Sequence, residues 1–160
     1  MSEQSVITQE MRDAIGVEGP QTVLEVDKTA VRMFARSVGH TDAVFYDEDE
    51  AKRRGFRSLP APPGYLGTPV YHPRAASDAD APAGPNRFKT PYKRILNAGT
   101  DIDYLADICA GDTLTSRSHI VEFAERTGSI GPMLITTTET VYTNQDGKVV
   151  AKSRGNLIQY

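Results

Sequence analysis

The stretch PMLITTTETVYTNQDGKVVAKSRGNLI, residues 132–158, decides the fold because it contains two long strand patterns and the turn between them. Its run ITTTETVY is rich in β-branched and aromatic side chains, which suit a pleated, half-buried surface. The tripeptide Gln145-Asp146-Gly147 is a strong hairpin signal. The pattern therefore predicts an antiparallel hairpin of two strands, residues 132–143 and 148–158.

Further strand patterns precede this hairpin. Residues 100–105 alternate apolar and polar side chains, and residues 113–123 predict another strand. Turns are expected at residues 110–112 and 126–129, where glycine and polar residues gather. Consecutive strands with short turns predict an antiparallel meander over most of the second half of the chain.

The first half of the chain predicts helices. After an N-terminal arm (1–19) with a short helix near residues 10–15, a strand is expected at 22–26. Asp27 is a good N-cap for a helix over residues 28–38. Its apolar stripe falls at i, i+3, i+4 and i+7, on Val31, Phe34, Ala35 and Val38.

Gly39 is placed to end this main helix, and a second, polar helix is predicted over residues 47–54. One main helix followed by a strand meander predicts an α+β fold with a single sheet. The chain has 160 residues, about the size of one domain, so residues 1–160 are predicted to form a single domain.

Residues 60–91 contain eight of the ten prolines. Proline fixes φ and removes a backbone donor, so a long helix or a central strand is not expected there. A short helical turn at residues 64–70 is predicted, and residues 72–90 are expected to form a flexible loop.

Composition and charge exclude several classes of function. The net charge of −3, with no basic stripe, argues against nucleic acid as a partner. No apolar run approaches the roughly 18 residues of a membrane span, and the polar N-terminus lacks the pattern of a signal peptide. The expected compartment is the cytoplasm. A lone Cys109 and three scattered histidines show no metal-ligand spacing, so no metal site is predicted.

Three motifs in the second half resemble a known superfamily. They are AGDTL at 110–114, ERTGSIGPM at 125–133 and TNQDGKVVA at 143–151. In this order they resemble the MaoC-like dehydratases, and most closely the N-terminal half known as the FAS1-like dehydratase group. The resemblance covers nearly the whole chain. It implies a hot-dog fold, in which a curled antiparallel sheet wraps a helix, here shortened by the proline-rich loop.

The segment RSVGHTDAVFYDEDEAKRRGFRSLPAPPGYL, residues 36–66, resembles the active-site signature of the same superfamily. That signature, G-D-x-N-P-x-H-x-D, carries a catalytic Asp and a catalytic His five positions apart in (R)-specific enoyl-CoA hydratases. Gly39 and Asp47 match it, but His40 stands at the Asp position and Phe45 at the His position. Hydration needs a base to activate water and an acid to protonate carbon, and Phe45 supplies neither.

The resemblance implies an acyl thioester of coenzyme A or of a carrier protein as substrate, with no metal or redox cofactor. It also implies pairing of two hot-dog domains, of which one supplies the dyad. The first hypothesis is therefore a non-catalytic, pocket-forming subunit of a heteromeric enoyl-thioester hydratase, as in the dehydratases of mycolic-acid elongation. The residues expected to line its acyl pocket are Phe45, Tyr65, Leu66, Asn97 and Gly99.

Two alternatives stay open at this point. One is a stand-alone hot-dog enzyme, a thioesterase or hydratase with relocated groups such as His40, Asp42 or Glu139. The other is a non-enzymatic acyl-CoA-binding homodimer. The role of the proline-rich loop stays open as well. It is either a surface insertion or a shortened helix that leaves room for a bulky acyl group.

Overall fold

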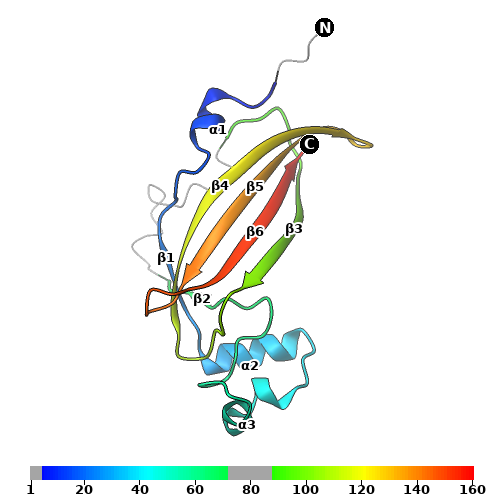
Figure 1. Cartoon of the computed structure of the whole chain (residues 1–160). Coiled ribbons are helices and arrows are strands. Elements are labelled where there is room, and N and C mark those ends of the chain that lie inside the picture. The colour runs from blue at the N-terminus through cyan, green and yellow to red at the C-terminus, as the bar shows by residue number, and fades with distance from the viewer. Residues whose placement is uncertain (1–4, 72–87) are drawn as a thin grey trace.

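The computed structural model describes residues 5–71 and 88–160. Six antiparallel strands form one curled sheet in the order β2-β1-β4-β5-β6-β3 (Figure 1). In chain order the strands are β1 (Thr22–Glu25), β2 (Thr68–Pro69), β3 (Ile95–Tyr104), β4 (Thr113–Gly128), β5 (Gly131–Thr143) and β6 (Val149–Gln159). The helices are α1 (Gln9–Asp13), α2 (Lys28–Ser37), the 3₁₀ turn η1 (Ala43–Phe45) and α3 (Glu48–Arg53). The predicted α+β architecture with one sheet is confirmed.

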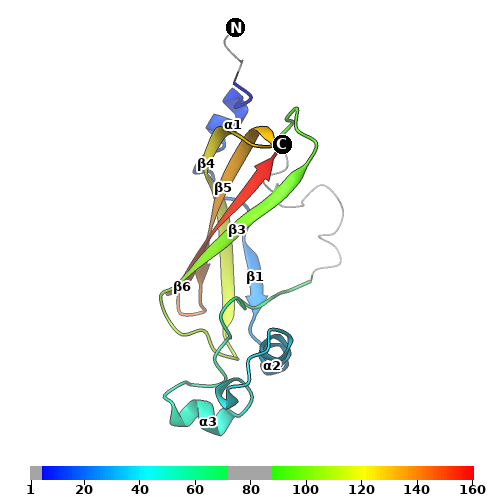
Figure 2. The same ribbon diagram turned by 90° about the vertical axis from the view of Figure 1, so that its right-hand side faces the viewer.

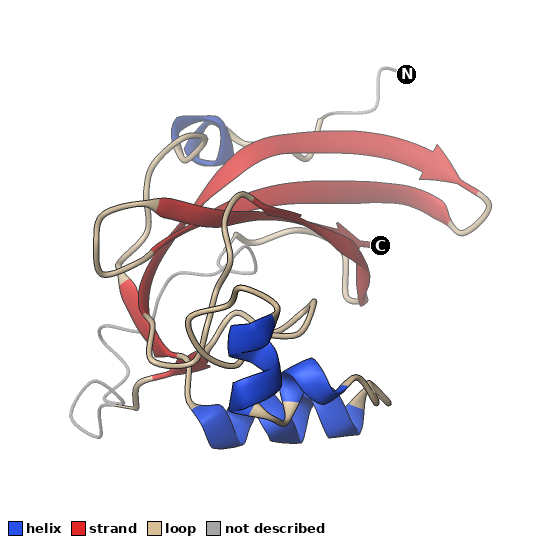
Figure 3. Ribbon diagram, turned by 60° about the horizontal axis from the view of Figure 1, so that its bottom comes forward, coloured by secondary structure: helices blue, strands red, loops and turns tan. Residues whose placement is uncertain are grey.

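The helices α2 and α3 lie together at one end of the sheet (Figures 1 and 3). The helix α2 begins at Lys28 as predicted, and α3 begins at Glu48, one residue after its predicted start. An aspartate caps each of them. The Asp27 carboxylate accepts hydrogen bonds from the backbone N–H of Thr29 at 2.7 Å and of Ala30 at 3.3 Å. Asp47 does the same for the first turn of α3. These caps satisfy donors that have no partner inside the helix.

Two apolar clusters lie on the same face of the sheet, as the strand register shows. The first joins Val31 of α2 to Leu114 and Ala151 of the sheet. The second joins Met11 of α1, which is fully buried, to Phe123 of β4 and other residues. Val6, Ile7, Met11 and Ala14 of the N-terminal arm are therefore part of this core.

The predicted helical turn at residues 64–70 is wrong. Thr68 and Pro69 form the short strand β2, which pairs with Glu25 and Leu24 of β1. Gly67 has φ of +95°, which an α-helix does not allow, and a Cβ added at this position would lie 3.0 Å from Leu24 Cβ and 3.3 Å from the Glu25 carbonyl oxygen. The edge of β1 supplies hydrogen-bond partners, and proline is tolerated because β2 is an edge strand.

The predicted turn at residues 126–129 comes too early. The hairpin pairs Arg126 with Met133 and continues to Gly128 opposite Gly131, so the turn consists of Ser129 and Ile130. The strand predicted at 100–105 begins earlier, at Ile95, and the strands predicted at 132–143 and 148–158 are confirmed within one residue. Residues 60–71 contain no helix. Of the flexible loop predicted at residues 72–90, residues 72–87 lie outside the described residues, and Phe88 is buried in the second apolar cluster.

Candidate functional site

The His40–Phe45 segment joins α2 to η1 and is held by the backbone. Gly39 ends α2 with φ of +77°. The His40 N–H donates to the Ala35 carbonyl oxygen at 2.9 Å, and the Tyr46 hydroxyl donates to the His40 carbonyl oxygen at 2.5 Å. The His40 and Phe45 rings are in contact, with centroids 5.1 Å apart. Within the described part of the chain, no carboxylate hydrogen-bonds to the His40 ring, so it lacks the partner that an acid–base pair requires.

Asp42 is the nearest carboxylate in sequence, but it has a structural role. It caps η1 by accepting a hydrogen bond from the Val44 N–H at 3.1 Å, and it accepts another from Arg54 Nη1 at 2.9 Å. The hydrogen bond from Val44, followed by that from Arg54, lowers the pKa of Asp42 below its usual value. A carboxylate held ionised in this way is a poor proton donor.

An apolar cavity of about 230 Å³ opens beside Phe45. The Phe45 side chain and residues of the 56–63 segment form one wall, and the end of β3 and the following loop form the other. Gly64 N–H donates to the Tyr104 hydroxyl at 2.7 Å, which ties the two walls together. The lining is Val44, Phe45, Phe56, Pro60, Ala61, Pro63, Tyr104, Ala106, Asp107 and Ile108. Such a lining suits a hydrocarbon group.

The other predicted pocket residues lie elsewhere. Tyr65 is buried in the first apolar cluster against the Phe34 ring, with its hydroxyl 2.9 Å from Thr68 Oγ1, and Leu66 packs against the same cluster. Asn97 and Gly99 lie at an irregularity in the pairing of β3 with β6, where the Gly99 N–H donates to Asn97 Oδ1 at 3.0 Å. Of the five predicted residues, Phe45 lines the apolar cavity, and a role of the other four in binding stays a prediction. The opposite wall, formed by Tyr104, Ala106, Asp107 and Ile108, carries no motif that could have identified it.

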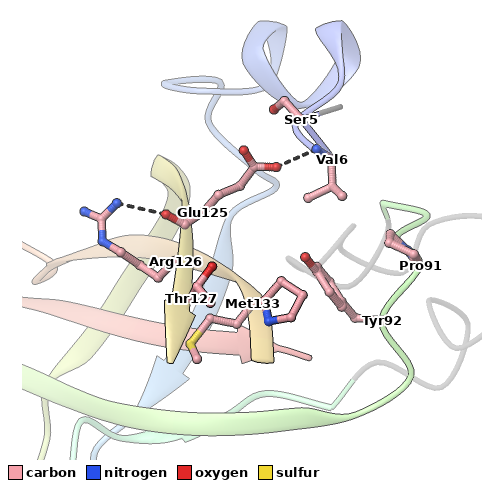
Figure 4. Close-up of a pocket in the computed structure, with 9 residues that line it drawn as sticks. Ser5, Val6, Pro91, Tyr92, Glu125, Arg126, Thr127 and Met133 are labelled. Atoms are coloured by element: carbon pink, nitrogen blue, oxygen red, sulfur yellow. Dashed lines mark hydrogen bonds between the residues drawn. The ribbon is translucent and has the colours of Figure 1, made fainter. Parts of the chain in front are cut away.

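A second cavity of about 500 Å³ lies at the opposite end of the sheet, between the N-terminal arm, the 91–92 segment and the β4–β5 hairpin (Figure 4). The Val6 N–H donates to Glu125 Oε1 at 2.5 Å, which fastens the arm to β4. Arg126 Nη1 donates to the Glu125 carbonyl oxygen at 3.0 Å. With a carboxylate and a guanidinium in its lining, this cavity is less suited to a hydrocarbon chain than the one beside Phe45.

A family model described as "FAS1-like, dehydratase domain region" matches residues 13–153. The chain belongs to this family. Among curated relatives of this FAS1-like dehydratase region, a UPF0336 protein of Parafrankia sp. is 25% identical over 134 residues, covering 84% of this chain and 83% of that protein. A UPF0336 protein of Mycobacterium tuberculosis is 26% identical over 133 residues, covering 83% of this chain and 78% of that protein.

Solved structures share the fold. The HadBC (3R-hydroxyacyl-ACP dehydratase) complex of M. tuberculosis gives a TM-score of 0.67 at 21% identity, covering 91% of this chain and 98% of that chain. The ChsH1-ChsH2 complex of M. tuberculosis gives 0.72 at 14% identity, covering 96% and 97%. The (R)-hydratase of A. caviae gives 0.58 at 16% identity, covering 89% and 94%. The FAS1-like dehydratase region therefore has the hot-dog fold that the motifs imply.

Two of the family motifs meet at one buried carboxylate, Asp112 of AGDTL. Its side chain is 0% exposed. It accepts hydrogen bonds from Arg57 Nη1 and Nη2 at 2.8 and 2.7 Å, from the Cys109 N–H at 2.9 Å and from Gln145 Nε2 at 3.0 Å. Gln145 belongs to TNQDG, and its Oε1 accepts from the Thr113 N–H at 3.1 Å. These motif residues therefore join the loops at one end of the sheet.

Glu139 lies on the opposite face of the sheet from the two apolar clusters. Its carboxylate accepts a hydrogen bond from Arg154 Nη2 at 2.8 Å and lies 3.9 Å from His119 Nε2. The hydrogen bond from Arg154 lowers the pKa of Glu139. Glu139 therefore does not converge with His40 or Asp42, which lie beyond α2.

Over residues 5–71 and 88–160, no helix is both long enough and apolar enough to cross a membrane. The same residues contain no group of three or more His, Cys, Asp or Glu side chains arranged to hold a metal ion.

Proposed function

We propose that this FAS1-like dehydratase-region chain is a non-catalytic, pocket-forming subunit of a heteromeric enoyl-thioester hydratase or dehydratase. The observation that carries the proposal is the pair His40 and Phe45 at the two positions where the resemblance expects Asp and His. The phenylalanine carries no proton to transfer, and the His40 ring rests on it at 5.1 Å between centroids. The acid–base pair for hydration is then supplied by a partner chain.

The residues around Phe45 favour the proposal that this chain forms a wall of the acyl pocket. The cavity beside it is apolar on both sides, and among the described residues that line it Asp107 alone is charged. Replacing a catalytic histidine by phenylalanine extends this apolar surface, and burial of hydrocarbon there favours binding by roughly 25 cal/mol per Å². The subunit therefore contributes binding energy and shape while the partner contributes chemistry.

The sheet also favours the proposal of a partner chain, because one of its edges is exposed. Strand β3 lies at the edge of the sheet, and on it Ile95 is 53% and Leu96 is 48% exposed. A long exposed edge strand with apolar side chains is a site for pairing with another chain. HadBC and ChsH1-ChsH2, which share the fold, are both complexes. The absence of helix from residues 60–71 favours room for a bulky acyl group, such as a long chain or a ring system.

The test is reconstitution. A hot-dog protein of the same host that carries an intact Asp and His five positions apart is co-expressed with this chain. Hydration of 2-enoyl-CoA substrates of increasing size is then followed by loss of the enoyl-thioester absorbance. The complex is expected to turn over substrates, long or ring-containing ones above all, while this chain alone does not. Turnover by this chain alone, lost in His40→Ala, would instead show a stand-alone enzyme.

A further inference from the structure

The outer edge of β3 is unpaired within the described part of the chain. The strand pairs with β6 on one side, and no described strand pairs with the other. Figure 2 looks onto this side of the sheet, with β3 nearest the viewer. Along β3, Ile102 is half-buried and the other residues are exposed. An edge of this length offers a row of unpaired N–H and C=O groups to another strand.

An irregularity divides this edge into two parts. The pairing with β6 shifts between Asn97 and Thr100, and Gly99 has φ of +114°. A bulge of this kind interrupts the ladder and leaves residues 100–104 as the regular segment available for pairing. That segment is Thr100, Asp101, Ile102, Asp103 and Tyr104.

Asp101 and Asp103 lie on the face of the sheet that carries Glu139, because they are in register with Arg154 and Lys152 of β6. Arg154 Nη2 is engaged by Glu139 Oε2 at 2.8 Å. Within residues 5–71 and 88–160, neither Asp101 nor Asp103 forms an ion pair. Two carboxylates without salt-bridge partners therefore stand side by side on the exposed edge.

We propose that Asp101 and Asp103 determine which chain pairs with the β3 edge: they exclude a second copy of this chain and select an edge strand with basic residues at alternate positions. This inference rests on the proposed function, in which the subunit acts with a partner, and it specifies the chemistry of that partner's edge.

The exclusion follows from register. Two copies can pair antiparallel through this edge so that the residues of each face of one sheet continue on the same face of the other. The two-fold axis between the copies then passes beside one residue of the regular segment and not between two residues. An axis at Ile102 places Asp101 opposite Asp103 of the second copy, twice over. An axis at Asp101 or at Asp103 places that aspartate opposite its own copy. Cross-strand neighbours lie about 5 Å apart, where like charges destabilise the pair, so these three of the five registers centred on residues 100–104 are penalised. In the other two, with the axis at Thr100 or at Tyr104, half of the contact falls on the irregularity or beyond the end of β3, so the ladder is short.

One other register, with the axis at Ala98, sets Lys93 of one copy level with Asp103 of the other. The irregularity adds one residue on β3, so Ile95 and Asn97 share a face with Thr100 and Ile102, and the alternation that places Asp103 on the other face does not continue to Lys93. That axis falls on the irregularity between Asn97 and Thr100, so both copies lack a continuous ladder where the contact is centred. A hydrogen-bonded edge contact is therefore not available in this register.

The preference for a basic strand follows from the charges across the sheet. One row crosses the four strands β4, β5, β6 and β3 through His119, Glu139, Arg154 and Asp101. From Glu139 onward the signs alternate, and a Lys or Arg on the next strand would continue them. On the other face, Ile102 and Tyr104 call for apolar neighbours. The fitting edge is one that alternates basic and apolar side chains.

Copies of this chain test the rule without any other protein. The double variant Asp101→Lys/Asp103→Lys is complementary to the native chain, because an axis at Ile102 brings each aspartate opposite an introduced lysine. Native mass spectrometry of the mixture in about 50 mM ammonium acetate is compared with each protein alone. The mixed dimer is expected to be at least about tenfold tighter than either self-dimer, and to weaken at about 500 mM salt.

A matched control changes charge away from the edge. Glu122→Lys, an exposed β4 residue, should not promote association with the native chain. The double variant Asp101→Asn/Asp103→Asn removes repulsion without reversing charge, so it should self-associate more strongly than the native chain even if the lysine variant folds poorly. Ile102→Cys in both partners of the mixture locates the contact, since pairing at this edge brings the two introduced thiols together, and an added thiol oxidant then converts them to a mixed disulfide.

A native chain that self-associates as tightly as the mixture, cross-linked through position 102, would overturn the inference. So would an asparagine variant that self-associates no better than the native chain. Either result leaves the proposed function standing, because that proposal is tested by turnover with a catalytic partner. Loss of turnover in the reconstituted complex, with the charge rule intact, would instead refute the proposed function.

Discussion

The guanidinium of Arg57 forms two parallel hydrogen bonds with the carboxylate of Asp112, at 2.8 and 2.7 Å. The acid is fully buried while the Arg57 side chain is 54% exposed, so the pair spans the boundary between the loop core and solvent. Gln145 and the Cys109 N–H occupy the remaining acceptor sites of the carboxylate. A buried carboxylate with all of these donors present is satisfied, and removing its charge leaves the donors without a partner.

Replacing this carboxylate should destabilise the protein. Asp112→Asn breaks the paired contact with Arg57, and we expect the free energy of unfolding to fall by about 2–4 kcal/mol. Urea unfolding followed by circular dichroism measures it. The matched control is Glu18→Gln, which removes an exposed ion pair with Arg117 at 3.7 Å and should change stability by less than about 0.5 kcal/mol. Equal effects in the two variants would contradict this role of Asp112.

The same carboxylate predicts acid sensitivity. Burial raises the pKa of Asp112, but hydrogen bonds from Arg57, the Cys109 N–H and Gln145 outweigh burial and lower the pKa below its usual 3.8. A carboxylate with a lowered folded pKa stabilises the fold above its unfolded pKa, and that stabilisation is lost as pH falls through the folded pKa.

The urea midpoint of the native protein should therefore fall as pH drops below about 4, near the unfolded pKa of an aspartate. In Asp112→Asn this fall should be shallower. Some slope will remain, because backbone hydrogen bonds at the helix caps also lower the pKa of Asp27 and Asp42. If the urea midpoints of the native protein and of Asp112→Asn fall equally with pH, Asp112 is not responsible for the acid sensitivity.

Thr136 is expected to be a site where a substitution stabilises the protein. The residue is 1% exposed, and among residues 5–71 and 88–160 its Oγ1 has no hydrogen-bond partner. Valine has the same shape without the buried hydroxyl, so Thr136→Val should raise the free energy of unfolding by about 1–2 kcal/mol. Thr140→Val is the control, because the Thr140 hydroxyl is 2.8 Å from Ser118 Oγ. That variant should not gain stability, and a lower melting temperature for Thr136→Val would refute the prediction.

The fold was largely predictable from sequence where a local signal coincides with the structure. Asp27 and Asp47 fixed the starts of two helices because capping depends on neighbouring residues alone. The hairpin at Gln145-Asp146-Gly147 was predictable for the same reason. The residues 64–70 were predicted incorrectly, because β2 exists only through pairing with β1, a contact that local propensity does not contain.

The candidate site was only partly predictable. Phe45 could be identified because a signature with known spacing ran through it. The opposite wall of its cavity, which includes Ala106 and Ile108, carries no motif and is brought there by the chain after β3. Tyr65, expected from the family resemblance to line the pocket, packs against Phe34 in the first apolar cluster, and its role in binding stays a prediction. A family resemblance places a residue in a segment but does not say whether its side chain lines a cavity or packs in the core.

Filling the cavity beside Phe45 should shorten the acyl groups that the reconstituted complex accepts. Ala106 lines this cavity. We expect Ala106→Phe to lower kcat/KM for long-chain 2-enoyl-CoA by at least about tenfold, with little effect on a four-carbon substrate, since binding energy scales with buried apolar area. Ala124→Phe, on the opposite face of the sheet, is the control. A uniform loss across chain lengths would argue against this cavity as the acyl site.

In the proposed complex the partner chain supplies the catalytic acid–base pair and this chain supplies a wall of the acyl pocket. The most direct test of this proposal is the rate of 2-enoyl-CoA hydration by the reconstituted complex when the dyad positions are changed in one chain at a time. Replacing the partner's motif Asp or His should abolish turnover, whereas His40→Ala in this chain should leave kcat within about twofold. A loss of kcat by orders of magnitude in His40→Ala, with the complex still assembled, would contradict the account.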